Sequence, residues 1–465
     1  MSSVDLYTKF TKGGILNTNF FNGRLLVAED LTALQTAGAQ QRQQLARALG
    51  DGVAYGLQVS LAPSSTPNAP VVRVTKGLAF NRNGQAAAVS LDFVDVALVI
   101  TPDTPAADAG MFAECPPPQP FQQLTNLGLY VFTVQPSSDY QDRVTMVELN
   151  SSGMGSSCGS KYVAEGVQFR FDPLQVTSGD SSTVRGQVAA LAAQLDPLLA
   201  QLANLSGAAQ SAFALTIAPM LSKFRNLVAH LCFGTDTLAR FPINIFPGAS
   251  GTPFPANYSV LDDMRAAGLL TDCEVPLALV YWTSSGLVFL DDWAVRRTLI
   301  PPAASAKWAP LLSPRRIAEG LAIFLQFQKQ VEDLRSNLPL TQLSSALGTD
   351  YFRFLPAAGF LPIGSISSSA GLDYVQFLKN NTYRNPVHAE GAVLDSLFLQ
   401  SLAFPPVDLN SQEMVWLYWV RQNMQFVVTS PANPSQQYMV LTNGHIEFQG
   451  CARYDLNYWD FANYD

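Results

Sequence analysis

Few residues in this sequence have the types and spacing that chemistry requires. Residues 155–159, GSSCG, match G-x-S-x-G, the pattern around the serine nucleophile of α/β-hydrolases. That serine has to lie in a sharp turn from a buried strand into a helix, with a histidine later in the chain. Here the alternating, strand-like stretch KYVAEGVQFRF follows instead. We therefore predict no nucleophile at residues 155–159.

The three histidines are the next candidates, because histidine is the usual general base near neutral pH. His230 lies in a predicted heptad helix, His388 follows a proline in a polar stretch, and His445 follows the turn Asn443–Gly444. None has another histidine or a cysteine at metal-ligand spacing. We expect structural roles for all three.

Two pairs of neighbouring acids, Asp262–Asp263 and Asp291–Asp292, could offer carboxylates to a hard cation. A calcium loop needs oxygen ligands at alternating positions and a glycine at the turn, and neither pair has this pattern. Asp262 fits better as a first-turn acid of a helix that begins at Ser259. Neither G-x-x-x-x-G-K-[ST] nor G-x-G-x-x-G, the glycine patterns that bind nucleotide phosphates, occurs in the sequence. Taken together, these observations predict no catalytic residue, no metal and no cofactor.

The composition restricts the class of partner. The net charge is -8 and the 28 basic residues are scattered, whereas nucleic-acid binding needs Lys and Arg clustered on one face. Charged residues make up 14% of the chain, against about 25% in an ordinary domain, so we expect other proteins to cover much of the surface. The five cysteines never have C-x-x-C spacing and are predicted to be reduced. With no signal peptide and no membrane-spanning run, we expect cytoplasmic synthesis and no transmembrane segment.

The hydrophobic pattern predicts an α+β protein with antiparallel β-rich units, an inserted helical hairpin and a mixed C-terminal region. Asn83–Gly84 between two alternating stretches is a hairpin signal, and the Ser-rich residues 151–160 predict a loop between strands. The predicted boundaries are 1–175 for an N-terminal helix and β-rich domain, 176–235 for the helical hairpin, 236–310 for a β-rich segment that completes the first unit, and 311–465 for a C-terminal α+β domain with an aromatic tail.

Apolar residues at alternating spacings of four and three define the two helices of the hairpin. They are Val184, Val188, Leu191, Leu195, Leu198, Leu202 and Leu205, then Phe213, Ile217, Met220, Phe224, Leu227 and Leu231. One interpretation is a protruding coiled coil that bundles with copies of itself or with a partner. The other is an antiparallel hairpin whose arms pack on each other within the chain. The spacing alone leaves both open.

Aromatic residues gather in two clusters. MVWLYW, residues 414–419, is predicted to supply core aromatics on a helix. The C-terminal cluster lies among Asp and Asn without a clean period, which is typical of an ordered peptide that lies on a neighbouring protein. The residues of this predicted docking tail are Tyr454, Tyr458, Trp459, Phe461 and Tyr464.

The N-terminal sequence NFFNGRLLVAEDL, continued by GVAYGLQV and VVRVTKGLAFNRNGQ, resembles the start of proteins encoded with phage-tail-like contractile injection systems. In those proteins an FFNGRLLTAEDL-like turn and helix leads into a GVVxGLxV-like strand and a hairpin. The motif residues are Phe20, Phe21, Asn22, Gly23, Arg24 and Asp30. Gly23 permits a tight turn, the two phenylalanines can anchor the turn in a core, and Arg24 can hold a carboxylate or carbonyl groups. Leu31, Leu34, Leu45 and Leu49 share one side of the following helix, so we expect that side to lie on another element.

The resemblance implies a non-enzymatic structural component of a contractile particle, at or around the baseplate. Its expected partners are other subunits of the particle, mainly those of the baseplate, with the spike and the sheath as further candidates. The resemblance also implies multiple copies and assembly in the bacterial cytoplasm. A receptor- or glycan-binding tail module that uses exposed aromatic residues is the alternative. A cell-wall hydrolase is the third hypothesis.

Overall fold

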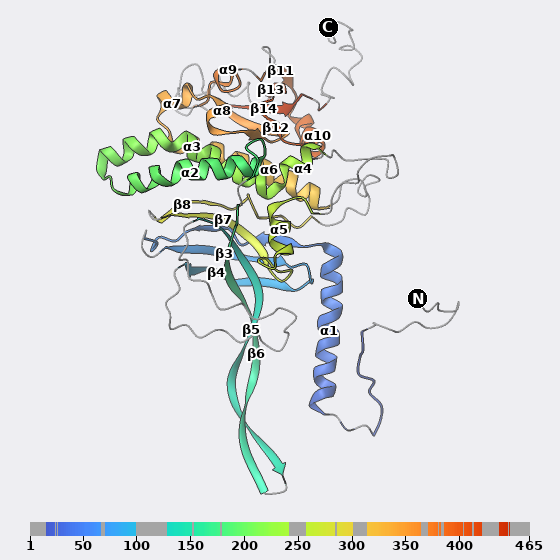
Figure 1. Cartoon of the computed structure of the whole chain (residues 1–465). Coiled ribbons are helices and arrows are strands. Elements are labelled where there is room, and N and C mark those ends of the chain that lie inside the picture. Colours follow the sequence, from blue (N-terminus) through green and yellow to red (C-terminus); the bar gives the residue numbers. More distant parts are fainter. Residues whose placement is uncertain are drawn as a thin grey trace, which may run out of the picture.

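The computed structural model of the chain describes most of its residues. The described ranges are 15–23, 25, 27–66, 70–98, 128–150, 153–176, 179–240, 257–283, 286–300, 314–363, 371–379, 381–382, 386–402, 404–411, 413–420, 437–444 and 446. Helices alternate with mostly antiparallel strands in several sheets, so the predicted α+β class is confirmed. Figure 1 shows the C-terminal region, a helical layer and two sheets stacked in that order, with one helix and one β-ribbon projecting beyond the sheets.

The first sheet is antiparallel and follows helix α1 (Ala28–Leu49). Its strands are β1 (Gly52–Gly56), β2 (Val59–Leu61), β3 (Val71–Phe80) and β4 (Ala86–Ala97). Strand β3 pairs with all three others. The β3–β4 hairpin turns at Asn83–Gly84 as predicted, and Gly84 has the positive φ of 76° that such a turn requires.

The second sheet, also antiparallel, has the order β6-β5-β7-β8. Its strands are β5 (Gly128–Asn150), β6 (Gly153–Pro173), β7 (Val275–Thr283) and β8 (Gly286–Asp291). Valines of β3 share a core with Phe132, Val134 and Leu277, so the two sheets pack against each other. Strand β7 pairs with β5, although the whole helical hairpin separates the two strands in the sequence. The predicted domain boundaries stay predictions.

Strands β5 and β6 form a ribbon, the β-arm, that extends far from the body (Figure 1). Strand β5 pairs with β7 only over 128–134, and within the described ranges residues 135–150 pair with β6 alone. At 3.3 Å per residue this part of the arm is about 50 Å long. The loop predicted at 151–160 is wrong from Gly153 onward, because these residues continue β6 in register with β5. Cross-strand pairing there overrides the low strand preference of Ser and Gly.

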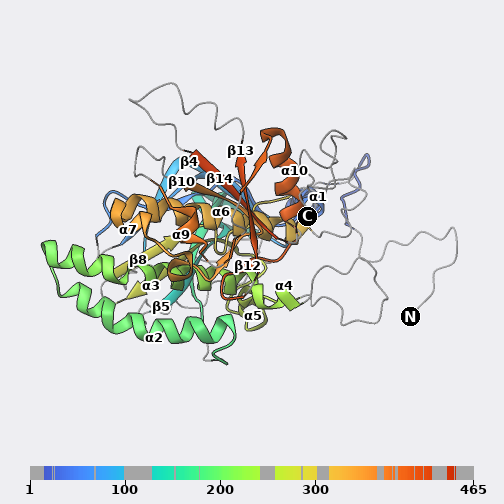
Figure 2. The same cartoon turned by 90° about the horizontal axis from the view of Figure 1, so that it is seen from above.

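Helices α2 (Val184–Ala203) and α3 (Gly207–Phe233) form an antiparallel hairpin and lie side by side (Figure 2). The last ten residues of α3, Phe224–Phe233, are all buried, and the seven apolar ones belong to the largest core cluster. The two arms pack on each other and on the body within the chain, as the second interpretation predicts. The short helices α4 (Thr235–Arg240) and α5 (Val260–Ala266) follow.

The C-terminal region packs on the other side of the helical layer. Its elements are α6 (Pro314–Asn337), α7 (Leu340–Ser344), α8 (Gly348–Tyr351), β9 (Phe354–Leu355), β10 (Ala358–Ile363), α9 (Tyr374–Phe377), β11 (Val387–Ala389), α10 (Gly391–Ser401), β12 (Val407–Asp408), β13 (Val415–Val420) and β14 (Gln437–Asn443). One sheet has the order β10-β14-β13-β11, and β12 pairs with β9. The helix predicted around MVWLYW is wrong, because β13 is a strand between β14 and β11. Its Val, Trp and Tyr residues are good strand formers, and a short apolar run has no distinguishing period.

A buried ionic network joins the helical layer to the sheets. Arg225 of α3 contacts Asp291 at the end of β8 and Asp333 of α6, and Gln326 of α6 also donates to Asp291. Burial alone would lower the pKa of Arg225, but the two carboxylates outweigh burial and raise it. Arg225 therefore stays charged and ties three elements together.

The cysteines depart from the expectation of reduced thiols at one position. Cys273 is disulfide-bonded, so the prediction is wrong for this residue. Cys232 is a buried free thiol, and burial raises its pKa to about 12, which keeps it protonated and unreactive at neutral pH.

Candidate interaction site

The N-terminal prong, residues 15–49 in its described part, is built around the motif residues. Gly23 has a φ of 90°, which permits the turn at Asn22–Gly23. Asp30 in the first turn of α1 is buried: its carboxylate accepts the backbone N–H of Val27, and its carbonyl accepts the hydroxyl of Thr18 at 3.0 Å. Asp30 thereby holds the segment that enters α1. Arg24 lies outside the described residues.

The motif phenylalanines do not lie in a core. Phe20 is 49% exposed and Phe21 is 63% exposed, so the expectation that they anchor the turn in a core is wrong. The turn lies at the far end of α1, and α1 holds it away from the body (Figure 1). We name the exposed group the apolar tip; it consists of Phe20, Phe21, Leu25, Val27 and Leu31.

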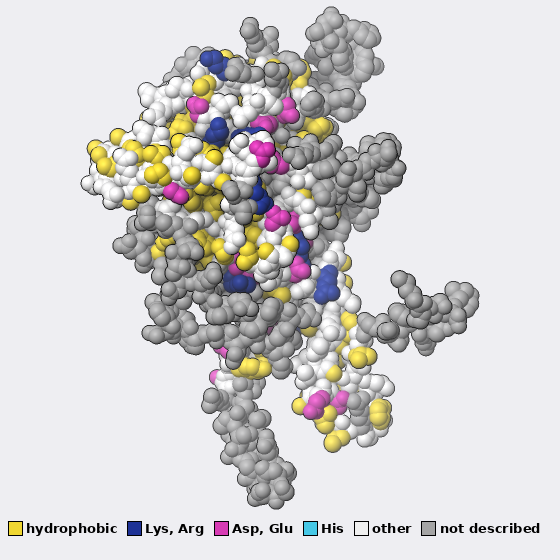
Figure 3. Space-filling model, viewed as in Figure 1, with side chains coloured by type: hydrophobic (Ala, Val, Ile, Leu, Met, Phe, Trp, Pro, Cys, Tyr) yellow, Lys and Arg dark blue, Asp and Glu magenta, His cyan; other side chains and the backbone are white. Residues whose placement is uncertain are grey.

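Helix α1 contacts the β3–β4 turn near its C-terminal end. Arg47 donates to the carbonyl of Asn83 at 2.8 Å, and Gly84 lies directly against the carbonyl of Gln43. The leucine side of α1 was expected to lie on another element, yet Leu45, for example, is 70% exposed. Figure 3 shows hydrophobic side chains along the prong and gathered at its far end. A helix of 22 residues is about 33 Å long, so the tip lies well away from the core.

The two described histidines differ in burial and lie on separate elements, α3 and β11. His230 is buried, and its Nδ1 lies 2.8 Å from the Thr235 hydroxyl. Burial and then the nearby Arg353 lower the pKa of His230 to about 3, so it stays neutral. His388 is exposed on the short strand β11, and His445 lies outside the described residues.

The other chemistry candidates have structural surroundings. Residues 155–159 lie within strand β6 and not at a strand-to-helix turn. Asp262 is the capping-box acid of α5, as its first-turn position predicted, and it shares hydrogen bonds with Ser259. Asp291 is held by Arg225. The described residues contain no group of three or more His, Cys, Asp or Glu side chains that could hold a metal.

A buried carboxylate pair, Asp172 and Glu274, was not foreseen from the sequence. The Thr133 hydroxyl lies 3.3 Å from an oxygen of each, and Arg170 contacts both. Burial and then Glu274 raise the pKa of Asp172 to about 8, so the pair holds a proton near neutral pH. Glu274 also accepts the backbone N–H and the hydroxyl of Thr271, so its oxygens already have partners. The two acids are 102 positions apart (274 − 172), and only the β5–β6–β7 pairing brings them together.

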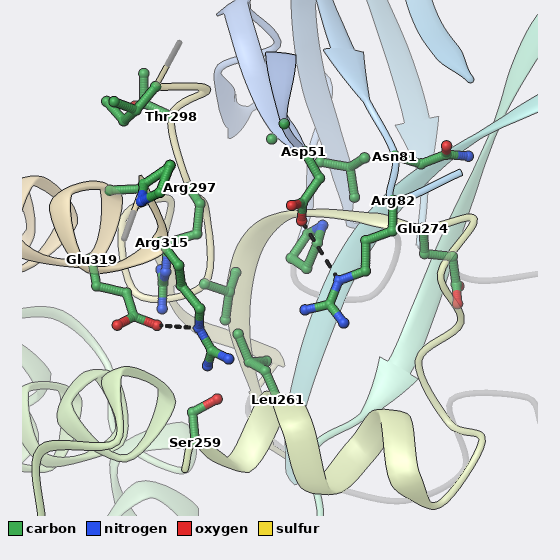
Figure 4. Close-up of a pocket in the computed structure, with 18 of the residues that line it drawn as sticks. Asp51, Asn81, Arg82, Ser259, Leu261, Glu274, Arg297, Thr298, Arg315 and Glu319 are labelled. Atoms are coloured by element: carbon green, nitrogen blue, oxygen red, sulfur yellow. Dashed lines mark hydrogen bonds and ion pairs between the residues drawn. The ribbon is translucent and has the colours of Figure 1, made fainter. Parts of the chain in front are cut away.

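An arginine-lined crevice lies where the first sheet meets α5 and α6 (Figure 4). Its cavity has a volume of about 120 Å³. Arg82 from the β3–β4 turn enters from one wall and Arg315 from the first turn of α6 enters from the opposite wall, while Arg265 and Arg297 complete the basic lining. We name this site the arginine crevice.

Two of the four arginines are fully engaged. Arg315 bonds Asp262 at 2.7 Å and Glu319 at 2.9 Å, and its pKa is raised because these carboxylates outweigh burial. Arg297 donates to main-chain carbonyls, among them that of Cys232 in the last turn of α3. A cation at that helix end is favourable, since the helix dipole is negative there.

The other two arginines have only distant ionic partners. Arg82 lies 3.6 Å from both Asp51 and Asp272, and Arg265 lies 3.9 Å from Asp262. The Nε of Arg265 is buried and has no hydrogen-bond partner in the structure. Burial and then repulsion from Arg82 lower the pKa of Arg265 to about 10, so it remains a cation at neutral pH. The crevice thus holds two guanidinium groups with unused donor capacity.

The comparisons with known proteins add little. No protein family and no curated protein matches the sequence. The chain is similar to the solved structure of TssK, at 10% identity and a TM-score of 0.21, covering 55% of this chain and 70% of that one. It is also similar to a chain of the TssK–TssF–TssG baseplate subcomplex of a type VI secretion system, at 13% identity and a TM-score of 0.19, covering 53% and 96%. Both scores are far too low to indicate a shared fold.

Each helix within the described ranges is too short or too polar to cross a bilayer.

Proposed function

We propose that this protein is a non-enzymatic structural subunit of a phage-tail-like contractile injection system, built into or around the baseplate. The observation that carries the proposal is the prong. A 22-residue helix extends an apolar tip away from the body, and that tip includes the motif that resembles proteins of such systems. Exposed apolar clusters of this kind mark interaction surfaces in soluble proteins.

The β-arm supports the same proposal. A two-stranded ribbon is marginally stable in water unless another element packs on it. Because residues 135–150 pair only with β6 within the described ranges, a neighbouring subunit is the natural support for the far part of the arm. Prong and arm project on the same side of the body in Figure 1, so one partner could contact both.

The low charge of the chain agrees with burial in an assembly. Only 14% of the residues are charged, although a protein that stays free in solution needs charges on its surface. We also propose that the predicted docking tail, Tyr454 to Tyr464, takes part in assembly, so that deletion of 452–465 prevents incorporation into particles.

The prong can be tested in the native host with a matched pair of variants. Phe21→Ser with Leu25→Ser removes two exposed side chains of the apolar tip, and Leu399→Ser removes a comparably exposed leucine on α10. Neither change removes core packing, so both proteins should fold, with effects on unfolding of about 0.5 kcal/mol or less. We expect the tip variant to be absent from purified sheath-and-tube particles and the Leu399→Ser protein to be present at the normal ratio. Normal incorporation of the folded tip variant would contradict the proposal.

A further inference from the structure

The arginine crevice contains guanidinium donors that the neighbouring carboxylates do not bond, as expected of an anion-binding site. Arg82 and Arg265 both line the cavity, and their nearest carboxylates, at 3.6 Å and 3.9 Å, are beyond hydrogen-bond distance. The buried Nε of Arg265 has no partner. A buried donor without an acceptor is unfavourable, and a charged donor more so. An oxyanion between the two guanidinium groups would satisfy both.

A carboxylate fits this space better than a larger anion. The cavity of about 120 Å³ has room for a small planar group and a few waters. The guanidinium fork matches the two oxygens of a carboxylate. Arg315, on the opposite wall, already holds the carboxylates of Asp262 and Glu319 and lies 4.0 Å over the ring of Tyr258. Arg315 thus shows that one guanidinium group of this region can hold carboxylates and stack on an aromatic ring together.

The C-terminal segment of this chain has that chemistry. Residues 454–465, YDLNYWDFANYD, contain three aspartates and five aromatic residues, with no lysine or arginine. The aspartates are Asp455, Asp460 and Asp465. Aromatic faces next to each aspartate can stack on arginine, as Tyr258 already does. The charge of the segment is opposite to that of the unfilled donors.

The last described residue before the segment lies near a helix that lines the crevice. Ile446, the last described residue, packs with Phe404, which lines a small cavity together with Ile323 of α6. Arg315 starts the same helix, about 12 Å from Ile323 at 1.5 Å per residue. Residues 447–453 can span up to about 23 Å when extended.

We propose that residues 454–465 dock in the arginine crevice of their own chain, with an aspartate carboxylate bound between Arg82 and Arg265. This inference concerns the isolated protein, before the segment takes part in assembly, and it does not depend on incorporation into a particle. The structural-subunit proposal can therefore fail while this one holds, and the reverse.

The test is the binding of a fluorescein-labelled peptide of residues 452–465, followed by fluorescence anisotropy. The receiving protein is the full chain with Asp455→Asn, Asp460→Asn and Asp465→Asn, which should leave the crevice free. We expect saturable binding to this triple variant and at least about tenfold weaker binding to the wild-type chain, whose own segment competes. Equal binding to both would overturn docking within one chain.

Three controls assign the binding to the crevice and to the carboxylates. Adding Arg82→Gln and Arg265→Gln to the triple variant should weaken binding by about tenfold or more, since each lost charged hydrogen bond contributes about that factor. Adding Arg335→Gln, on a surface pair with Glu332 of α6, should change nothing. A peptide with all three aspartates replaced by asparagine should bind no better than a scrambled one. Unchanged binding with the double arginine variant, or with the asparagine peptide, would overturn the proposal.

Discussion

The replacement Arg225→Met tests whether the buried ionic network holds the layers of the fold together. Arg225 is almost entirely buried, and its Nε and Nη1 bond Asp291 and Asp333. Methionine keeps much of the side-chain volume and removes the charge and all donors. The change therefore isolates the ionic contribution from packing.

The structure allows the size of the effect to be worked out. Asp333 is 30% exposed and keeps Lys329, so its loss is small. Asp291 is fully buried and keeps only the uncharged donors of Gln326 and the backbone N–H groups that follow it. Removal of one partner from a buried pair destabilises by about 3–5 kcal/mol, because the remaining charge has no cation. We expect the loss in the free energy of unfolding to fall in that range.

A double variant distinguishes the destabilisation by the unpaired Asp291 charge from the destabilisation by the lost Arg225 contacts. With Arg225→Met and Asp291→Asn together, residue 291 is neutral and its remaining oxygen can still accept the two backbone N–H groups. Most of the lost stability should return. Arg73→Met is the matched control, because Arg73 also pairs closely with an aspartate, Asp95, but on the surface.

The assay is urea unfolding followed by tryptophan fluorescence, with the first transition compared among the four proteins. A loss below about 1 kcal/mol for Arg225→Met would refute the argument, because a buried pair cannot then be holding Asp291. An equal loss for Arg73→Met would refute it too, since exposed pairs are screened by water.

Three further predictions follow from single residues. Because the pKa of Asp172 is raised from 3.8 to about 8, the folded protein holds a proton that the unfolded chain releases, so stability falls as pH rises from 4 to 8; Asp172→Asn should flatten that fall in urea midpoints, and an unchanged slope would contradict the shift. The pKa of His230 is lowered from 6.5 to about 3, so between these values the unfolded chain binds a proton that the folded protein does not. The stability of the fold therefore decreases as the pH falls from 6.5 to 3, and His230→Gln should reduce that decrease in the same urea series. Gly84→Ala should loosen α1, because a Cβ there would lie 2.2 Å from the carbonyl oxygen of Gln43, and we expect faster amide hydrogen exchange in α1. Gly207→Ala, where φ is also positive but the space around the glycine is open, should leave α1 unchanged.

The sequence predicted correctly those elements that neighbouring residues determine. The Asn83–Gly84 turn, the α5 cap at Ser259 and the two helices of the hairpin all follow from neighbouring residues. MVWLYW misled because six apolar residues have no measurable period, and its sheet neighbours decide that it is a strand. Residues 153–160 misled because their partner β5, and not their own propensity, makes them a strand.

The candidate sites were only partly accessible to sequence reasoning. The motif turn was found, but its exposure was not, because the phenylalanines look like core residues until the direction of α1 is known. The arginine crevice draws on residues 82, 265, 297 and 315, and no local pattern links them. The same holds for Asp172 and Glu274, which meet only through long-range strand pairing.

The most direct test of the central claim is quantitative mass spectrometry of sheath-and-tube particles purified from the native host. If the protein is a built-in subunit, its ratio to the tube protein will be constant from one preparation to the next and will survive a high-salt wash. Absence from the particles, with the chain recovered as a free monomer, would contradict the account.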